Sequence, residues 1–441
     1  MKRDAYQRLV AWKISERRKP LLLKGARQTG KTYLLMEFGK KEYGQVHYFN
    51  FEEVPRLGQF FEKNLDPRRI LNDLEIYSKS KIRPEQDLVI FDEIQTSNAA
   101  LNSLKYFQEQ APEYHLACAG SLLGVKLSTP RSFPVGKVNF LDLRPLTFLE
   151  FLEAVGESRY RMVLEETEKL VPYAEPFHQE LIDLLHQYYF VGGMPEAVKC
   201  YAEKRDPFEV RQIQREVIDS YILDFAKHAP ASDIPKLTLI WDSLLSHLAR
   251  EHRKFIFSAL KKGARAREYE NALVWLKDAG LIHRASAVQK SQFPLKHYAD
   301  QNCFKVYMLD VGLLGAMART PTTVLVERYR LFEEYKGALA ENYVAQQLIA
   351  FLGMEELYYW RSEGGKAEID FLIELEDRIY PLEVKSGIRP RSRSLSSYAD
   401  QFSPDSLLRL NLLNLKRDSQ TCNFPLYAVS LLTKPWSQSA V

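Results

Sequence analysis

The fold is decided by residues 21–32, which read Leu-Leu-Leu-Lys-Gly-Ala-Arg-Gln-Thr-Gly-Lys-Thr. An apolar strand here runs directly into the pattern Gly-x-x-x-x-Gly-Lys-Thr, and an apolar helix follows from Tyr33 to Phe38. This order of strand, loop and helix is the context that a phosphate-binding P-loop requires. The glycines let backbone N–H groups close around an anion, and the helix N-terminus adds positive charge. The structural alternative is a glycine-rich turn that binds nothing.

The loop predicts a site for a nucleoside triphosphate, taken to be ATP, with Mg²⁺. Lys31 is expected to reach the β- and γ-phosphates and to act in catalysis, while the Thr32 hydroxyl holds Mg²⁺. We expect every residue of the loop, and the one after it, to contact the nucleotide: Gly25, Ala26, Arg27, Gln28, Thr29, Gly30, Lys31, Thr32 and Tyr33.

A second motif, residues 87–93, reads Asp-Leu-Val-Ile-Phe-Asp-Glu. Four apolar residues before two acids form the Walker B pattern, and such a run suits a parallel strand covered on both faces. Ligands bind at the carboxyl ends of these strands. We therefore expect Asp92 to contact Mg²⁺ and Glu93 to polarise the attacking water as general base. A buried strand that simply ends in solvated acids is the alternative.

A third strand is expected over residues 115–120, and Ser121 follows it. A polar side chain at that point can sense the γ-phosphate or orient the water. It can equally cap the next helix. The sequence leaves both roles open.

The composition points to a soluble chain of several domains. Its 441 residues exceed one ordinary core, and 46% hydrophobic with 27% charged residues is typical of globular proteins. The net charge of +4 is too small to predict nucleic-acid binding by itself. The four cysteines form no CxxC pair, which disfavours zinc and redox sites. Without a signal peptide or an apolar run of ~18 residues, we expect a cytoplasmic protein with no membrane partner.

Four segments together resemble the prokaryotic AAA-type ATPases that carry a C-terminal domain of unknown function; they are residues 25–32, 88–95, 120–121 and 143–151. Residues 188–196 and 305–313 also match that family. The resemblance implies an α/β fold with a five-stranded P-loop (ASCE) parallel sheet and a helical lid. We expect the ATPase core at 1–155 and the lid at 156–230.

One position departs from the family pattern. Members often have Gly-Arg before the last strand of the core, whereas this chain has Gly136-Lys137. A lysine cannot make the forked contact of an arginine finger. Arg131 and Arg144 are the other candidates, and Arg144 can instead fix the strand end. An arginine finger from a second copy of the chain would require a homo-oligomer.

Residues 231–320 have the order of a winged helix-turn-helix: two helices, then two strands joined by a polar turn. Arg265 and Arg267 come early in the second helix, where DNA readers meet the groove. With Lys261 and Lys262 they can also form an ordinary solvated face. Double-stranded DNA is therefore a candidate partner.

Residues 330–435 resemble the PD-(D/E)XK nuclease fold. The expected order is a helix, three strands, a second helix and two strands, the last at 426–431. The resemblance implies a nuclease-like α/β domain at the C-terminus and leaves open whether it cuts DNA with a metal.

The acidic residues of this region are consistent with that chemistry. Glu383 and Lys385 point to one face of a strand, because strand side chains repeat every second residue. Asp370, Glu383 and the Val384 carbonyl could hold Mg²⁺, Glu341 could complete the ring, and Lys385 could activate water. The alternative is a decayed scaffold whose carboxylates only bind structural water.

The sequence supports three functional hypotheses. The first is an ATPase that couples its nucleotide state to DNA recognition or processing. In this hypothesis the basic residues 385–393 form a loop that steers a phosphate backbone, although they can equally be an ordinary solvated loop. The second is an ATP-controlled DNA nuclease. The third is a slow signalling switch whose C-terminal domains bind a protein and cut nothing.

Overall fold

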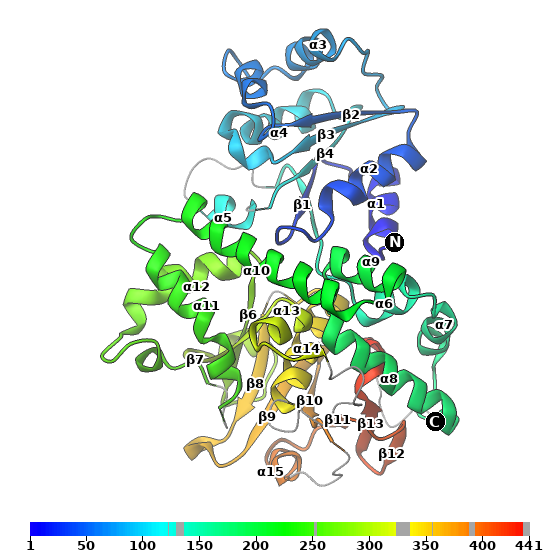
Figure 1. The fold of residues 1–441 in the computed structure, drawn as a ribbon, viewed down its shortest axis with the longest axis vertical. Helices are drawn as coiled ribbons and strands as arrows, with labels where there is room; N and C mark the ends of the chain where they lie inside the picture. Colours follow the sequence, from blue (N-terminus) through cyan, green and yellow to red (C-terminus); the bar gives the residue numbers. More distant parts are fainter. Residues whose placement is uncertain are drawn as a thin grey trace. The chain divides into compact units, whose positions relative to one another are not determined.

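The computed structural model describes residues 1–121, 123–128, 136–250, 254–322, 336–354, 356–387 and 393–434. The chain divides into two compact units (Figure 1). The N-terminal unit holds residues 2–144 and 278–280, and the C-terminal unit holds 145–277 and 281–441. The predicted lid, winged helix and nuclease-like region thus fall mainly in one unit. The boundaries predicted between them remain predictions.

The N-terminal unit is a parallel sheet with helices between the strands. Its described strands lie in the order β2-β3-β4-β1-β5, and each is parallel to its neighbours. The elements are α1 (Ala5–Ile14), β1 (Leu21–Lys24), α2 (Lys31–Glu42), β2 (Gln45–Asn50), η1 (Pro55–Phe61), α3 (Pro67–Ser78), β3 (Asp87–Asp92), η2 (Ile94–Thr96), α4 (Asn98–Gln110), β4 (His115–Ala119), α5 (Leu123–Ser128) and β5 (Asn139–Asp142). This order confirms the expected P-loop ATPase sheet.

The sheet is buried on both faces because its central strands β1, β3 and β4 are apolar at every position except their ends. Leu21 and Leu23 of β1 pack with α1 and α2 on one face. Leu22 packs on the opposite face, in a cluster that includes residues of α3 and α4. Neighbouring strands alternate in the same way, as expected when side chains repeat every second residue. The two clusters form the hydrophobic core of the unit.

The candidate functional residues gather at one edge of this sheet. Leu23 of β1 is opposite Ala119 of β4, and Phe91 of β3 is opposite Cys118. Since these strands are parallel, their carboxyl ends meet at the same edge. The P-loop follows β1 there, Asp92 ends β3, and Ser121 comes just after β4.

The C-terminal unit contains a mixed sheet and most of the helices. The described strands lie in the order β12-β13-β11-β10-β9-β8-β6-β7. They are β6 (Ile282–Val288), β7 (Ala299–Met308), β8 (Leu357–Arg361), β9 (Glu368–Leu375), β10 (Arg378–Val384), β11 (Leu407–Asn411), β12 (Lys416–Asp418) and β13 (Thr421–Pro425).

The helices of this unit are α6 (Phe148–Ala154), α7 (Ser158–Glu166), α8 (Glu175–Val191), α9 (Pro195–Lys204), α10 (Pro207–His228), α11 (Ile234–Leu248), α12 (Ala266–Asp278), α13 (Val311–Met317), α14 (Lys336–Leu352) and α15 (Arg393–Phe402). Short 3₁₀ turns are η3 (Phe257–Ala259), η4 (Leu295–Tyr298), η7 (Glu363–Gly365) and η8 (Leu426–Thr433). No helix within the described ranges has the length and apolar character needed to cross a membrane.

The two strands expected as a wing belong to the same sheet as the nuclease-like strands. β6 and β7 form an antiparallel hairpin, and β6 also pairs in parallel with β8 from Ala285↔Leu357 to Val288↔Trp360. The helices expected as a lid belong to the same unit. Within it, His178 of α8 hydrogen-bonds the Tyr427 hydroxyl at 2.8 Å.

One predicted strand is wrong. Residues 426–431 form the 3₁₀ turn η8, and the preceding residues 421–425 form β13 instead. Pro425 ends β13, because proline has no N–H group to continue the ladder. Almost every residue of η8 is buried, so its continuous apolar run could not distinguish a buried strand from a buried turn of helix.

Candidate functional site

The P-loop has the backbone that its glycines were expected to allow. Gly25 has φ +148°, Gln28 +64° and Gly30 +89°. A Cβ atom added to Gly25 would lie 2.2 Å from the carbonyl oxygen of Leu143, so only glycine fits there. Helix α2 begins at Lys31, directly after Gly30. The loop therefore ends at a helix N-terminus, as an anion site requires.

Lys31 lies against the loop that precedes it. Its Nζ donates to the carbonyl oxygens of Gly25 at 2.9 Å and Ala26 at 2.7 Å, and the residue is 6% exposed. The Thr29 hydroxyl also donates to Ala26, at 2.9 Å. Arg3 donates to the carbonyl oxygen of Thr29 at 3.0 Å. The two contacts of Lys31 hold its ammonium group at the loop, and those of Thr29 and Arg3 brace the loop backbone.

Thr32 and Asp92 are brought together as the sequence predicts. The Thr32 hydroxyl donates to Asp92 Oδ2 at 2.7 Å, and the Tyr48 hydroxyl donates to the same oxygen at 2.8 Å. Octahedral Mg²⁺ binds oxygen at about 2.1 Å, which sets neighbouring ligands about 3 Å apart. The Thr32 and Asp92 oxygens have this spacing, so the pair fits a magnesium ion.

Glu93 has a strained backbone and a well-defined set of partners. Its φ is +50°, which is uncommon for a residue with a side chain. Glu93 Oε2 accepts hydrogen bonds from the Ser121 hydroxyl at 3.1 Å and from the Gln95 amide. Strain of this kind is often found at functional positions. The hydroxyl of Ser121 thus contacts the predicted general base.

Sequence reasoning missed three residues of this site: Arg3, Tyr48 and Gln95. Arg3 looked like part of a charged helix, and no local pattern links it to a loop so much later in the chain. Tyr48 looked like an ordinary strand residue. Gln95 falls inside the segment that carries the family resemblance, but the motif itself gives it no role. A Cβ atom at Gly120 would lie 2.0 Å from Gln95 Oε1, so Gly120 leaves the space for this side chain.

The arginine-finger candidates Arg131 and Arg144 remain predictions, and the contacts that bear on them involve Lys137 and the backbone of Arg144. Lys137 pairs with Glu109 of α4 at 3.0 Å. The carbonyl oxygen of Arg144 accepts a hydrogen bond from Arg3 at 2.6 Å, which fixes the chain after β5. Arg131 lies outside the described residues.

The predicted C-terminal site residues also converge, but around a lysine. Lys305 of β7 is 1% exposed, and its Nζ lies 3.0 Å from Glu341 and 2.7 Å from Glu368. Asp370 is 3.9 Å from the same nitrogen. The Tyr307 hydroxyl donates to Glu341 as well. Sequence reasoning did not include Lys305, Tyr307 or Glu368 in this cluster.

Glu383 and Lys385 pair with each other at 2.9 Å. The second oxygen of Asp370 accepts a hydrogen bond from the backbone N–H of Val384 at 2.8 Å. Across the described residues, no group of three or more acidic, histidine or cysteine side chains is arranged to hold a metal ion. The donor set expected for a nuclease metal therefore does not fit one in this arrangement.

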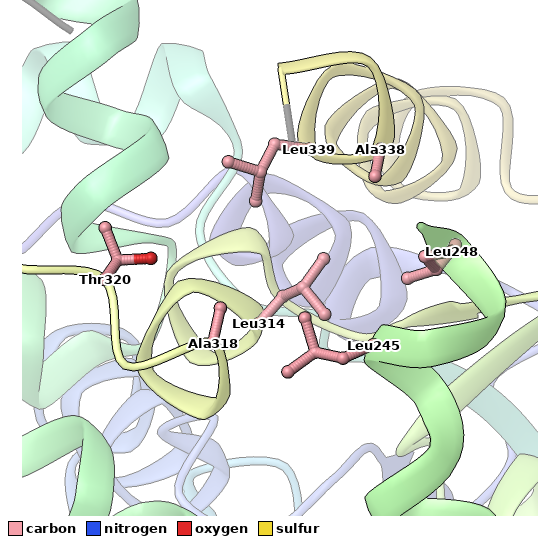
Figure 2. Close-up of a pocket in the computed structure, with 7 residues that line it drawn as sticks. All are labelled: Leu245, Leu248, Leu314, Ala318, Thr320, Ala338 and Leu339. Carbon is pink, nitrogen blue, oxygen red and sulfur yellow. The ribbon is translucent and has the colours of Figure 1, made fainter. Parts of the chain in front are cut away.

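A small apolar pocket lies elsewhere in the C-terminal unit, among leucines of α11, α13 and α14 (Figure 2). Ala318, Ala338 and Thr320 complete its lining. Figure 2 shows a single hydroxyl group among the labelled side chains. Without a charged group, the pocket offers nothing that would bind a phosphate.

Comparison with known protein families gives three matches along the chain. Residues 17–152 match the AAA domain. Residues 182–323 match a domain of unknown function (DUF8612), and residues 336–427 match another (DUF4143).

Two curated relatives are uncharacterized proteins of Mycobacterium bovis and Mycobacterium tuberculosis. Each is 37% identical over 94 residues, which is 21% of this chain and 20% of the relative. The matched stretch thus spans about a fifth of either relative.

The solved structures that match this chain include two proteins with low TM-scores. The Aeropyrum pernix ORC1 protein in complex with DNA has a TM-score of 0.30 at 15% identity, over 73% of this chain and 91% of that one. The Thermotoga maritima RuvB Holliday junction branch migration motor has a TM-score of 0.31 at 16% identity, over 65% and 90%. With the AAA match and the parallel sheet order, residues 17–152 form an AAA domain.

Proposed function

We propose that the N-terminal unit binds ATP with Mg²⁺ and hydrolyses it at the edge of the sheet where β1 and β3 end. The observation that carries this proposal is the 2.7 Å contact between the Thr32 hydroxyl and Asp92, directly beside the P-loop. These two oxygens come from the two motifs that the chemistry requires. Their convergence supports a metal–nucleotide site rather than a glycine-rich turn.

Each residue has a separate role in this mechanism. Bound Mg²⁺ would neutralise charge that develops on the phosphates. Loop N–H groups and the Lys31 ammonium bind and orient the triphosphate. Glu93 accepts the proton of the attacking water, and Ser121 holds the Glu93 carboxylate by its hydroxyl at 3.1 Å. Thr32 and Asp92 would hold the metal.

Binding and hydrolysis can be separated by two variants. We expect Lys31→Ala to abolish ATP binding in calorimetry. Glu93→Gln should bind ATP normally and lose turnover by about 10²-fold or more, because only the general base is removed. Lys40→Ala is the control, since Lys40 is an exposed cation on the same helix. Normal turnover in Glu93→Gln would exclude Glu93 as the base.

We propose further that the ATPase responds to double-stranded DNA through the start of α12. Lys261, Lys262, Arg265 and Arg267 are all exposed there. Clustered cations of this kind bind phosphates and displace counterions, so the affinity falls with salt. The ATPase rate with and without DNA is the direct measurement.

A charge-matched comparison tests the location. Replacing both Arg265 and Arg267 by glutamine should weaken DNA binding and reduce its salt dependence. Replacing Lys63 and Lys79, two exposed lysines of the N-terminal unit, removes the same charge elsewhere. Equal effects of the two double variants would mean that binding is not localised at α12.

The alternative output is a nucleotide-controlled switch whose C-terminal unit binds a protein partner without cutting DNA. The pairing of Glu341 and Asp370 with Lys305, and of Glu383 with Lys385, supports this alternative over a nuclease. A plasmid-nicking assay with Mg²⁺ or Mn²⁺ distinguishes the two. Nicking by the wild type that Asp370→Ala abolishes would establish the nuclease, whereas equal nicking by both would indicate contamination.

A further inference from the structure

Lys305 is a buried cation with an unusual number of acidic neighbours. It lies on β7, and carboxylates approach it from α14, through Glu341, and from β9, through Glu368 and Asp370. The face of the Tyr359 ring lies 4.8 Å from the same nitrogen. All four charged groups belong to the C-terminal unit, so their arrangement is independent of the proposed ATPase activity.

A buried ammonium group and buried carboxylates each require a partner of opposite charge. The ammonium group has three N–H donors and no acceptor. Here it meets two carboxylates within hydrogen-bonding distance and a third at 3.9 Å. Lys305 therefore supplies one positive charge that the three carboxylates share.

The contacts of Nζ are those of an N–H donor, because the nearest carboxylate oxygen lies 2.7 Å away, a normal distance for a charge-assisted hydrogen bond. The other oxygen of Asp370 is occupied by the Val384 N–H. Glu383, the strongest metal-ligand candidate on β10, pairs with Lys385. Lys305 and Lys385 would both have to move away from their carboxylate partners before a metal ion could bind those carboxylates.

We propose that the Lys305 ammonium is the resident cation of this cluster, in the role that a divalent metal has in metal-dependent nucleases. While Lys305 is in place, the cluster takes up neither Mg²⁺ nor Mn²⁺. The C-terminal unit therefore recognises its partner without cleaving phosphodiester bonds. Glu341 and Asp370 retain an acidic arrangement like that of a nuclease, but they hold a lysine.

The test measures Mn²⁺ bound to the full-length, nucleotide-free protein by electron paramagnetic resonance. Any Mn²⁺ at the N-terminal unit is common to all variants and is subtracted. We expect Asp370→Asn to bind the same amount as the wild type. We expect Lys305→Met, which keeps the length of the side chain and removes its charge, to gain one Mn²⁺ per chain. That gain should disappear in the double variant with Asp370→Asn.

Two results would overturn the proposal. One is Mn²⁺ binding by the wild-type protein that is lost in the Asp370→Asn variant. The other is a folded Lys305→Met variant that gains no Mn²⁺, because its carboxylates would then not form a cation site. If Lys305→Met does not fold, the comparison of the wild type with Asp370→Asn decides alone.

Discussion

Substituting Gly25 by alanine tests the close approach on which the P-loop depends. The added Cβ would lie 2.2 Å from the carbonyl oxygen of Leu143, whereas ordinary contacts begin at 3.4 Å. Either the loop or the chain at Leu143 must move by more than 1 Å. The Leu143 N–H donates to the Lys24 carbonyl at 2.8 Å, and the Arg144 carbonyl is held by Arg3. The chain at Leu143 is thus fixed on both sides, and we expect the loop to be displaced.

Two free-energy costs add when Gly25 is replaced by alanine. An alanine at positive φ costs roughly 1–2 kcal/mol, and overpacking a well-filled site costs roughly 1–3 kcal/mol. We therefore expect Gly25→Ala to lower the free energy of unfolding by about 2–5 kcal/mol. Gly136 is the control, because its φ is +75° and no atom of the described part of the chain lies within 4 Å of an added Cβ. Gly136→Ala should cost only the backbone term, roughly 1–2 kcal/mol.

Urea unfolding of the two variants measures this difference, and ATPase kinetics measures its effect on function. A displacement of ~1 Å in a catalytic site commonly costs about 10²-fold in rate, so kcat/KM of Gly25→Ala should fall by that order. Gly136→Ala should keep the wild-type value. If both variants are equally stable and both bind ATP, the contact with Leu143 does not constrain the loop.

Three further predictions concern single groups of the N-terminal unit. Ser121→Ala removes one donor from Glu93, and we expect kcat to fall by about 10-fold or more while ATP affinity measured by calorimetry stays the same. Tyr48→Phe removes a donor from the buried Asp92 carboxylate, which keeps other donors, so urea unfolding should show a loss of about 1.5 kcal/mol. Burial, with help from nearby cations, lowers the pKa of His115 from 6.5 to about 4. Below about pH 6.5 the unfolded chain then binds a proton that the native chain does not, so the free energy of unfolding should fall as the pH drops from about 6.5 to about 4. A His115→Phe variant should show a weaker dependence in urea titrations across that range.

The N-terminal sheet could be predicted because its signals are local. Residues 21–32 place a strand, a loop and a helix in order, and residues 87–93 combine a buried strand with the acids at its end. The partners of these residues could not be predicted in the same way. Tyr48 and Gln95 act through contacts that only the register of the strands and the turn after Asp92 bring about.

The C-terminal site was less predictable for a physical reason. A motif search finds acids that follow a known spacing, and it found Glu341, Asp370 and Glu383. It cannot find a lysine that reaches the acids from another strand, because the pairing of β6 with β7 and β8 determines where Lys305 lies. The pairing of β6 with β8 also places the two strands of the predicted wing in one sheet with the nuclease-like strands.

The two candidate sites differ in how their charges are balanced, and this difference suggests how the units divide the chemistry. At the N-terminal site, Asp92 accepts hydrogen bonds from the hydroxyls of Thr32 and Tyr48, which carry no charge. A carboxylate in that environment keeps its negative charge available for a cation that arrives with the nucleotide. In the C-terminal unit, the carboxylates around Lys305 already share one resident cation. Metal chemistry is therefore expected at the first site and recognition at the second.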